Sequence, residues 1–191
     1  MGRMFGFSYG EKENGAVFSH MTVMYAYALY KNGFAREGYK ALKTLYEAAS
    51  DFERSRMYPG IPEYFNIEGR GVYTYLTGAA SWYLLTMITQ VFGVRGEAGE
   101  LVIEPKLMPE QFNENGEAGI NLYFRGRKLN ISICNRDGSE YGRYGILTAS
   151  CNGEKIKTPE DEGIQADALR IGLSELKAGE ENEIKIIIGR L

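Results

Sequence analysis

One histidine and one Thr-Gly pair are the residues of this chain whose types are best suited to binding an anion. His20 is the only histidine, and Thr77-Gly78 precede an apolar run with helical periodicity. A threonine before a helix is a typical N-cap, and the N–H groups that follow it can bind an anion, phosphate above all. Capping alone also explains a Thr-Gly pair, and a lone histidine near a helix start is more often a core residue. Whether these two features form an anion site therefore depends on the residues beside them.

A loop rich in glycine and proline, residues 57–71, separates the histidine from the threonine. It contains Glu63, Tyr64, Asn66 and Arg70. Carboxylates, amides, arginines and aromatic rings are side chains from which sugar sites are built. We predict that these four residues bind substrate; the alternative is a structured loop packed by its own aromatic rings.

Four short segments resemble, in content and order, the end of the catalytic barrel of glycoside hydrolase family 94, formerly glycosyltransferase family 36. They are residues 14–20 (Asn-Gly-Ala-Val-Phe-Ser-His), 61–64 (Ile-Pro-Glu-Tyr), 69–71 (Gly-Arg-Gly) and 75–82 (Tyr-Leu-Thr-Gly-Ala-Ala-Ser-Trp). The resemblance is strong over residues 11–105 and weaker afterwards. This family contains the cellobiose, cellodextrin, chitobiose and related phosphorylases. The resemblance implies an α+β fold, in which the terminal helices of an (α/α)6 barrel are followed by an antiparallel β-sandwich.

The resemblance also implies a reaction, the inverting phosphorolysis of a β-linked gluco-oligosaccharide to α-glucose 1-phosphate and a shortened sugar. Inorganic phosphate is then the co-substrate, and no cofactor or metal is expected. An inverting glycosidase needs an acid and a second carboxylate that activates water. Phosphate is already a nucleophile, so a phosphorylase needs hydrogen-bond donors that hold it in line with the anomeric carbon. By resemblance, His20, Thr77 and Gly78 match the family's phosphate contacts.

The general acid is missing. The family takes it from an aspartate well upstream of the histidine motif, and none of the four aspartates here, Asp51, Asp137, Asp161 and Asp167, has that context. We therefore assign no catalytic residue and expect the chain to be inactive by itself. It is interpreted as a C-terminal fragment of such a phosphorylase, with a non-catalytic carbohydrate-binding, phosphate-binding or interaction protein as the alternative.

The pattern of the sequence changes from helical to strand-like near residues 96–99, which predicts domains 1–98 and 99–191. Helical periodicity covers residues 17–31, 34–49 and 79–92. Asn32-Gly33 is predicted to end the first helix, and the second is predicted to place Leu42, Leu45, Tyr46 and Ala49 on one face. Six later segments alternate as strands do: 101–103, 120–124, 129–133, 146–150, 168–171 and 183–188. Arg125-Gly126 and Asn152-Gly153 are predicted as turns, the latter with the signature of a tight hairpin.

Composition and charge restrict the partners and the cellular location that we expect for the protein. A net charge of −3 and a pI near 5.4 argue against nonspecific binding to nucleic acid or membrane surfaces. No secretory signal is recognisable, and Cys134 and Cys151 lack metal-like spacing, so we expect free thiols and a cytoplasmic location. The third helix is apolar all round and needs neighbours. The expected partners are a β-glucan oligosaccharide, phosphate, and either a second copy or the missing N-terminal part of the enzyme.

Overall fold

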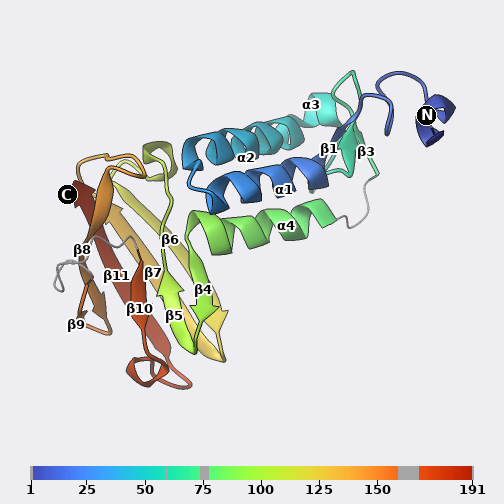
Figure 1. The fold of residues 1–191 in the computed structure, drawn as a ribbon. Coiled ribbons are helices and arrows are strands. Elements are labelled where there is room, and N and C mark those ends of the chain that lie inside the picture. Colours follow the sequence, from blue (N-terminus) through green and yellow to red (C-terminus); the bar gives the residue numbers. More distant parts are fainter. Residues whose placement is uncertain (1, 59, 74–77, 159–167, 191) are drawn as a thin grey trace. The chain divides into compact units, whose positions relative to one another are not determined.

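A computed structural model of the chain describes residues 2–58, 60–73, 78–158 and 168–190 (Figure 1). The chain forms two compact units, Met1–Met87 and Ile88–Leu191. Residues 96–99, where the sequence pattern changes, lie inside the second unit, at the end of one strand and in the turn to its antiparallel partner. The division by packing thus falls earlier than the predicted boundary between residues 98 and 99.

The first unit is mainly helical. Its elements are η1 (Gly2–Gly6), β1 (Val17–Phe18), α1 (Ser19–Lys31), α2 (Ala35–Ser50), α3 (Phe52–Ser55), β2 (Tyr64–Phe65), β3 (Gly71–Val72) and α4 (Gly78–Thr86). Helix α1 packs against both α2 and α4, as Figure 1 shows. Strands β1, β2 and β3 form a small antiparallel sheet that the sequence analysis did not anticipate.

The connection between α1 and α2 follows from local sequence. Gly33 has a φ of +83°, and Phe34 N–H donates to Leu29 O at 2.9 Å, which is the bonding of a Schellman cap. The predicted helix end at Asn32-Gly33 is therefore confirmed. At the crossing of the two helices a Cβ on Gly38 would lie 2.5 Å from the Tyr30 ring, so only glycine permits this close approach.

Helix α2 buries the face that its periodicity predicts, with one exception. Leu42, Leu45 and Ala49 are buried, whereas Tyr46, predicted on the same face, is 60% exposed. A tyrosine at the margin of an apolar face can turn its ring to solvent, because the ring bears a polar hydroxyl.

Helix α4 ends earlier than predicted. The apolar period covers residues 79–92, but the α-helix stops at Thr86 and one π-helical segment, η2 (Met87–Val91), follows. Among the described residues four α-helices are present and they close no barrel, so the (α/α)6 part of the fold expectation is not confirmed. The α+β class itself is confirmed.

The second unit consists of strands. They are β4 (Val94–Glu97), β5 (Glu100–Ile103), β6 (Glu117–Phe124), β7 (Arg127–Asn135), β8 (Tyr144–Cys151), β9 (Glu154–Ile156), β10 (Leu169–Ile171) and β11 (Glu181–Arg190), with the short helices η3 (Pro109–Gln111) and η5 (Leu173–Glu175) between them. They form a sheet of order β10-β5-β4 and one of order β6-β7-β11-β8-β9. Alternate residues of β7 and β11 are buried, as a half-covered sheet requires.

All six predicted strands are present, but the sheet is not fully antiparallel. Strand β11 runs parallel to β7 and antiparallel to β8. The last strand enters between two earlier ones, and no local pattern determines such a long-range insertion. The predicted turns are confirmed: Arg125-Gly126 and Asn152-Gly153 both have positive φ at both residues, as a two-residue hairpin turn of this type needs.

Of the helices within the described residues, none is both long and apolar enough to cross a membrane.

Candidate anion and sugar site

The ring of His20 lies against the first residue of α4. A Cβ built on Gly78 would lie 3.0 Å from His20 Cε1 and 3.1 Å from Nδ1. His20 is the second residue of α1, and the start of α1 is held by a hydrogen bond from Ser19 N–H to Glu63 O at 2.9 Å. The packing of α1 on α4 thus brings together two residues that are far apart in sequence.

One nitrogen of this histidine, Nε2, is buried. Among the residues that the structure describes, none hydrogen-bonds to His20 Nε2. Thr77, predicted beside it, lies outside the described residues. The Trp82 ring covers another side, with ring centroids 5.7 Å apart. A buried ring nitrogen left unpaired costs free energy, and a bound ligand or water would recover it.

Three of the predicted sugar-binding residues, Tyr64, Asn66 and Arg70, lie on the hairpin β2–β3 or in its loop, and Glu63 immediately precedes β2. Tyr64 Oη donates to Glu11 Oε2 at 3.0 Å, and Asn66 Nδ2 donates to Glu11 Oε1 at 3.1 Å. One carboxylate thus holds two of the predicted residues in place. The sequence analysis did not assign Glu11, and no local signal marks it, because its partners lie 53 and 55 positions away.

Asn66 also shapes its own loop. Its Oδ1 accepts hydrogen bonds from Glu68 N–H at 3.1 Å and Arg70 N–H at 3.0 Å, the pattern of an Asx turn. Arg70 is exposed, and the backbone oxygen of Glu63 is engaged by α1. The amide of Asn66 therefore has a structural role in addition to any contact with sugar.

Burial and a nearby carboxylate keep the Tyr64 hydroxyl protonated. Desolvation by burial is the largest cause, and the hydrogen bond to Glu11 and its negative charge add to it; together they raise the pKa of Tyr64 to about 12. At neutral pH this hydroxyl is therefore a hydrogen-bond donor.

A cation and aromatic rings lie next to Tyr64, one of the two residues that bind Glu11. Lys12 Nζ is 4.9 Å from the centroid of the Tyr73 ring and 5.3 Å from that of Phe7. The Tyr73 ring meets Tyr64 edge-on at 5.9 Å, and Phe18, two residues before His20, lies 5.4 Å from Tyr64. The cluster combines apolar ring faces with one cation and one anion, a combination typical of polar ligand sites.

The aspartates that the structure describes are engaged as structural groups. Asp51 Oδ1 caps α3 by accepting from Arg54 N–H at 3.2 Å. Asp137 accepts from Arg190 N–H at 2.8 Å and from Ser139 N–H at 3.1 Å, and these bonds lower the pKa of its carboxyl. A carboxylate stabilised in its charged form is a poor proton donor. Asp161 and Asp167 lie outside the described residues.

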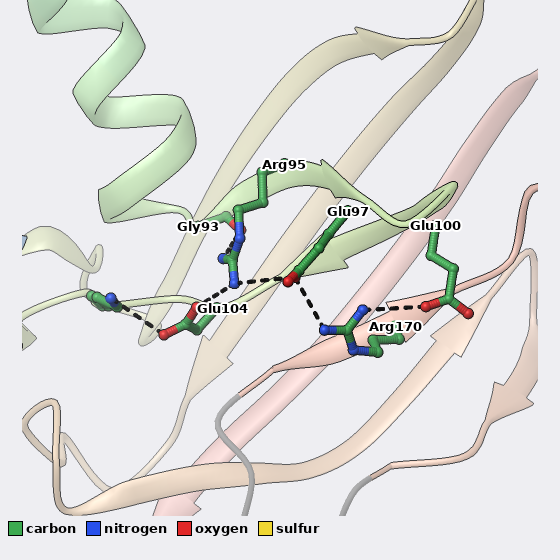
Figure 2. A network of polar contacts seen from close by, with 7 residues as sticks. Gly93, Arg95, Glu97, Glu100, Glu104 and Arg170 are labelled. Atoms are coloured by element: carbon green, nitrogen blue, oxygen red, sulfur yellow. Dashed lines mark hydrogen bonds and ion pairs between the residues drawn. The ribbon is translucent and has the colours of Figure 1, made fainter. Parts of the chain in front are cut away.

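A second polar cluster, in the other unit, joins three strands by ion pairs (Figure 2). Glu104 binds Arg95 at 2.7 Å and Lys106 at 3.2 Å. Arg170 of β10 binds Glu97 at 3.0 Å and Glu100 at 3.3 Å. The three cations and three carboxylates of this ion-pair network neutralise one another. We therefore interpret the network as a structural feature that stabilises the sheet, not as a site for a charged ligand.

Within the described parts of the chain no group of three or more His, Cys, Asp or Glu side chains is arranged to hold a metal ion.

Comparison with known proteins adds a distant relationship. The chain is 26% identical over 145 residues to a cellobionic acid phosphorylase of Neurospora crassa, an alignment that covers 70% of this chain. It spans only 18% of the length of that relative. No family model matches the chain. The similarity supports a relationship to phosphorylases, in agreement with the motif resemblance to glycoside hydrolase family 94 and at no finer level.

Proposed function

We propose that this chain is the C-terminal part of an inverting β-glucoside phosphorylase and carries the phosphate-binding half of its active site. The observation that carries the proposal is the His20 ring, which rests on Gly78 at the start of α4 with Nε2 buried and without a partner among the described residues. A helix start and a histidine donor facing one spot are suited to an oxyanion. The relationship to a phosphorylase supplies the class of reaction.

In this proposal His20, Thr77 and Gly78 hold inorganic phosphate. A phosphate oxygen attacks the anomeric carbon, the glycosidic C–O bond breaks, and the leaving sugar oxygen takes a proton from an acid outside this chain. Because the nucleophile is already an anion, the protein's task is to orient it and to stabilise its charge. No second carboxylate is needed to activate water.

The sugar-binding role is proposed for Glu63, Tyr64, Asn66 and Arg70. The carboxylate of Glu11 orients two of them, Tyr64 and Asn66, by the hydrogen bonds at 3.0 and 3.1 Å. Orientation before binding reduces the entropy lost when a ligand is bound. The substrate class proposed is a β-linked gluco-oligosaccharide.

Titration of the chain with inorganic phosphate, followed by nuclear magnetic resonance, tests the phosphate half of the proposal. We expect the Gly78 amide and the His20 ring signals to shift together with millimolar affinity. His20→Phe keeps a ring of similar size against Gly78 and Trp82 but has no nitrogen, so it should abolish the joint response. The matched control is Lys185→Gln on β11, which should respond as the wild type does.

Two results would contradict the proposal. One is a phosphate response that persists unchanged in His20→Phe. The other is a response spread over surface lysines, with equal shifts produced by chloride at the same ionic strength, since general screening acts on all exposed charges.

A further inference from the structure

The imidazole ring of His20 contacts two residues on one face of α4. Gly78 and Trp82 are four positions apart in that helix, which places them on the same side. The Cε1 atom of His20 is 3.0 Å from the Cβ position built on Gly78, and the ring centroids of His20 and Trp82 are 5.7 Å apart. Helices α1 and α4 lie side by side and begin at the same end (Figure 1). The contact therefore falls within the first two turns of each helix.

Trp82 is in turn packed against Tyr27. Tyr27 follows His20 by seven positions, which is two turns further along the same face of α1. Its ring meets the indole edge-on, with centroids 5.7 Å apart and an interplanar angle of 81°. The indole of α4 thus contacts two rings of α1, and all three side chains are part-buried. Movement of the indole would disturb both contacts, so its position is well determined.

Within the described parts of the chain, packing and not hydrogen bonding holds the His20 ring. Neither of its nitrogens has a hydrogen-bond partner among the described residues. Functional histidines are usually oriented by an acceptor that binds one ring nitrogen and leaves the other for the ligand. The terminal torsion of a histidine side chain has a broad energy profile, so an imidazole without such an acceptor can rotate. The neighbouring indole is the group that limits this rotation, because aromatic pairs attract each other at the observed separation.

We propose that Trp82 is a positioning residue of the anion site. Its indole holds the imidazole of His20 against Gly78, so that a ring nitrogen faces the anion at the start of α4. Trp82 acts through His20 and does not touch the anion. An imidazole that is fixed before binding loses less side-chain entropy when the anion binds. This role depends on the proposed phosphate-binding function and adds to it a residue outside the predicted contacts.

Nuclear magnetic resonance of the full chain measures two quantities that test the role of Trp82. The first, without phosphate, is the nuclear Overhauser effect between the His20 ring proton on Cε1 and the α-protons of Gly78. The second is the dissociation constant of inorganic phosphate, from the shift of the Gly78 amide. Trp82→Leu removes the aromatic face, so it should weaken the Overhauser effect and raise the dissociation constant about three- to tenfold. Trp82→Phe restores an aromatic face and should recover both quantities.

The matched control is Tyr83→Leu, at the next position of α4. Tyr83 is also part-buried, but its hydroxyl donates to Leu42 O of α2 at 3.4 Å. The substitution removes an aromatic ring from the same helix and should leave both quantities at their wild-type values. Circular dichroism verifies that all variants keep the wild-type helix content.

The outcomes separate this role from the proposed function. If the wild type binds phosphate and Trp82→Leu binds it equally well, the positioning role is overturned and the phosphate site stands. Equal losses in Trp82→Leu and Tyr83→Leu would also overturn the role, because a general loosening of α4 would then be responsible. A Trp82→Phe variant as weak as Trp82→Leu would do the same. A wild type that binds no phosphate would overturn the proposed function itself, and the positioning role with it.

Discussion

At the scale of single residues, the least expected finding is the role of Glu11. It receives hydrogen bonds from Tyr64 and Asn66 and so connects the N-terminal loop to the β2–β3 hairpin. Neither partner is near it in sequence, and a glutamate in a charged segment carries no distinguishing feature. Its importance comes from the two donors that surround its carboxylate, because hydrogen bonds to a charged group are stronger than those between neutral groups.

Glu11→Gln should lower the pKa of Tyr64 from about 12. The substitution removes the negative charge that opposes ionisation of the phenol, while burial, the largest cause, remains and keeps the pKa above 10. Titration of the Tyr64 ring by nuclear magnetic resonance measures the change. The exposed neighbour Glu13→Gln is the control and should leave the Tyr64 titration as it is. An equal shift in both variants would contradict the assigned interaction.

Asn182→Ala should lower the free energy of unfolding by about 2 kcal/mol. The Asn182 side chain is fully buried, and its Oδ1 accepts from Lys177 N–H at 2.8 Å while its Nδ2 donates to Lys177 O at 3.0 Å. Its removal leaves a cavity in the buried position and takes away both hydrogen bonds to the Lys177 backbone, which are part-buried. Urea unfolding of the strand-rich unit provides the measurement. Asn130→Ala, at an exposed site of β7, should change stability by less than about 0.5 kcal/mol; similar values for the two variants would refute the prediction.

At the scale of elements, polar networks stabilise strand pairings that the hydrophobic pattern of the sequence does not determine by itself. The ion-pair network of Figure 2 joins β4, β5 and β10, which are short strands of three or four residues. The environments of its members differ. The Lys106 side chain is 9% exposed and that of Glu104 22%, whereas Glu100 is 44% exposed. Solvent screens the outer pairs more strongly than the inner one.

The network should therefore respond unequally to loss of its acids. Glu104→Gln removes one ion-pair partner from both Arg95 and the nearly buried Lys106, and we expect a loss of about 1–2 kcal/mol, less than that for a fully buried pair. Glu100→Gln removes one exposed pair and should cost less than about 0.5 kcal/mol. Thermal unfolding at low and high salt measures both. A larger loss for Glu100→Gln than for Glu104→Gln would show that burial does not rank these pairs.

The helices of the first unit should lose stability in alkaline solution. Burial, with the neighbouring tyrosines as a lesser cause, raises the pKa of Tyr83 to about 12, above its ordinary value of 10.0. Burial also raises the pKa of Tyr30. A raised pKa in the folded state gives stability that is complete below the ordinary pKa and is lost as pH rises through the raised one. Helix content, measured by circular dichroism, should fall between about pH 10 and 12.

The matched variant for the alkaline transition is Tyr83→Phe. It keeps the ring in place and removes the ionising hydroxyl, so the transition should become less steep. Tyr123→Phe, on an exposed position of β6 in the other unit, is the control. An unchanged transition in Tyr83→Phe would mean that another group governs alkaline unfolding.

At the scale of the whole molecule, the proposed anion site is accompanied by no aspartate placed as a general acid among the residues that the structure describes. Asp51 caps a helix, and Asp137 is held in its ionised form. The relationship to a phosphorylase extends over only 18% of that relative's length. These facts support the proposal that catalysis requires further polypeptide.

The purified chain should therefore catalyse no detectable phosphorolysis of cellobiose or longer β-glucans. Loss of a general acid alone typically lowers the rate by about 10²–10⁴-fold. Assay of glucose 1-phosphate release, with a complete phosphorylase as the positive control, measures this. Phosphate-dependent release by the 191-residue chain would refute the interpretation as a fragment.

Local sequence patterns were sufficient to predict most helices, strands and turns. The Asn32-Gly33 helix end, the Asn152-Gly153 turn and all six strands follow from periodicity and turn residues, which act between near neighbours in the chain. The same patterns failed for features that depend on tertiary packing. They did not predict that Tyr46 is exposed, that α4 ends at Thr86, or that the sheet β1-β2-β3 forms from strands of two residues.

The tertiary structure alone decided which distant residues meet. The parallel entry of β11 between β7 and β8, the Glu11 carboxylate beside Tyr64, and the His20 ring on Gly78 all join segments far apart in the chain. The residues of the candidate site were nevertheless named from the sequence, since their types and the motif resemblance restrict the chemistry. Their arrangement could not be, because distances across a fold are determined by the sum of many packing contacts that no short pattern contains.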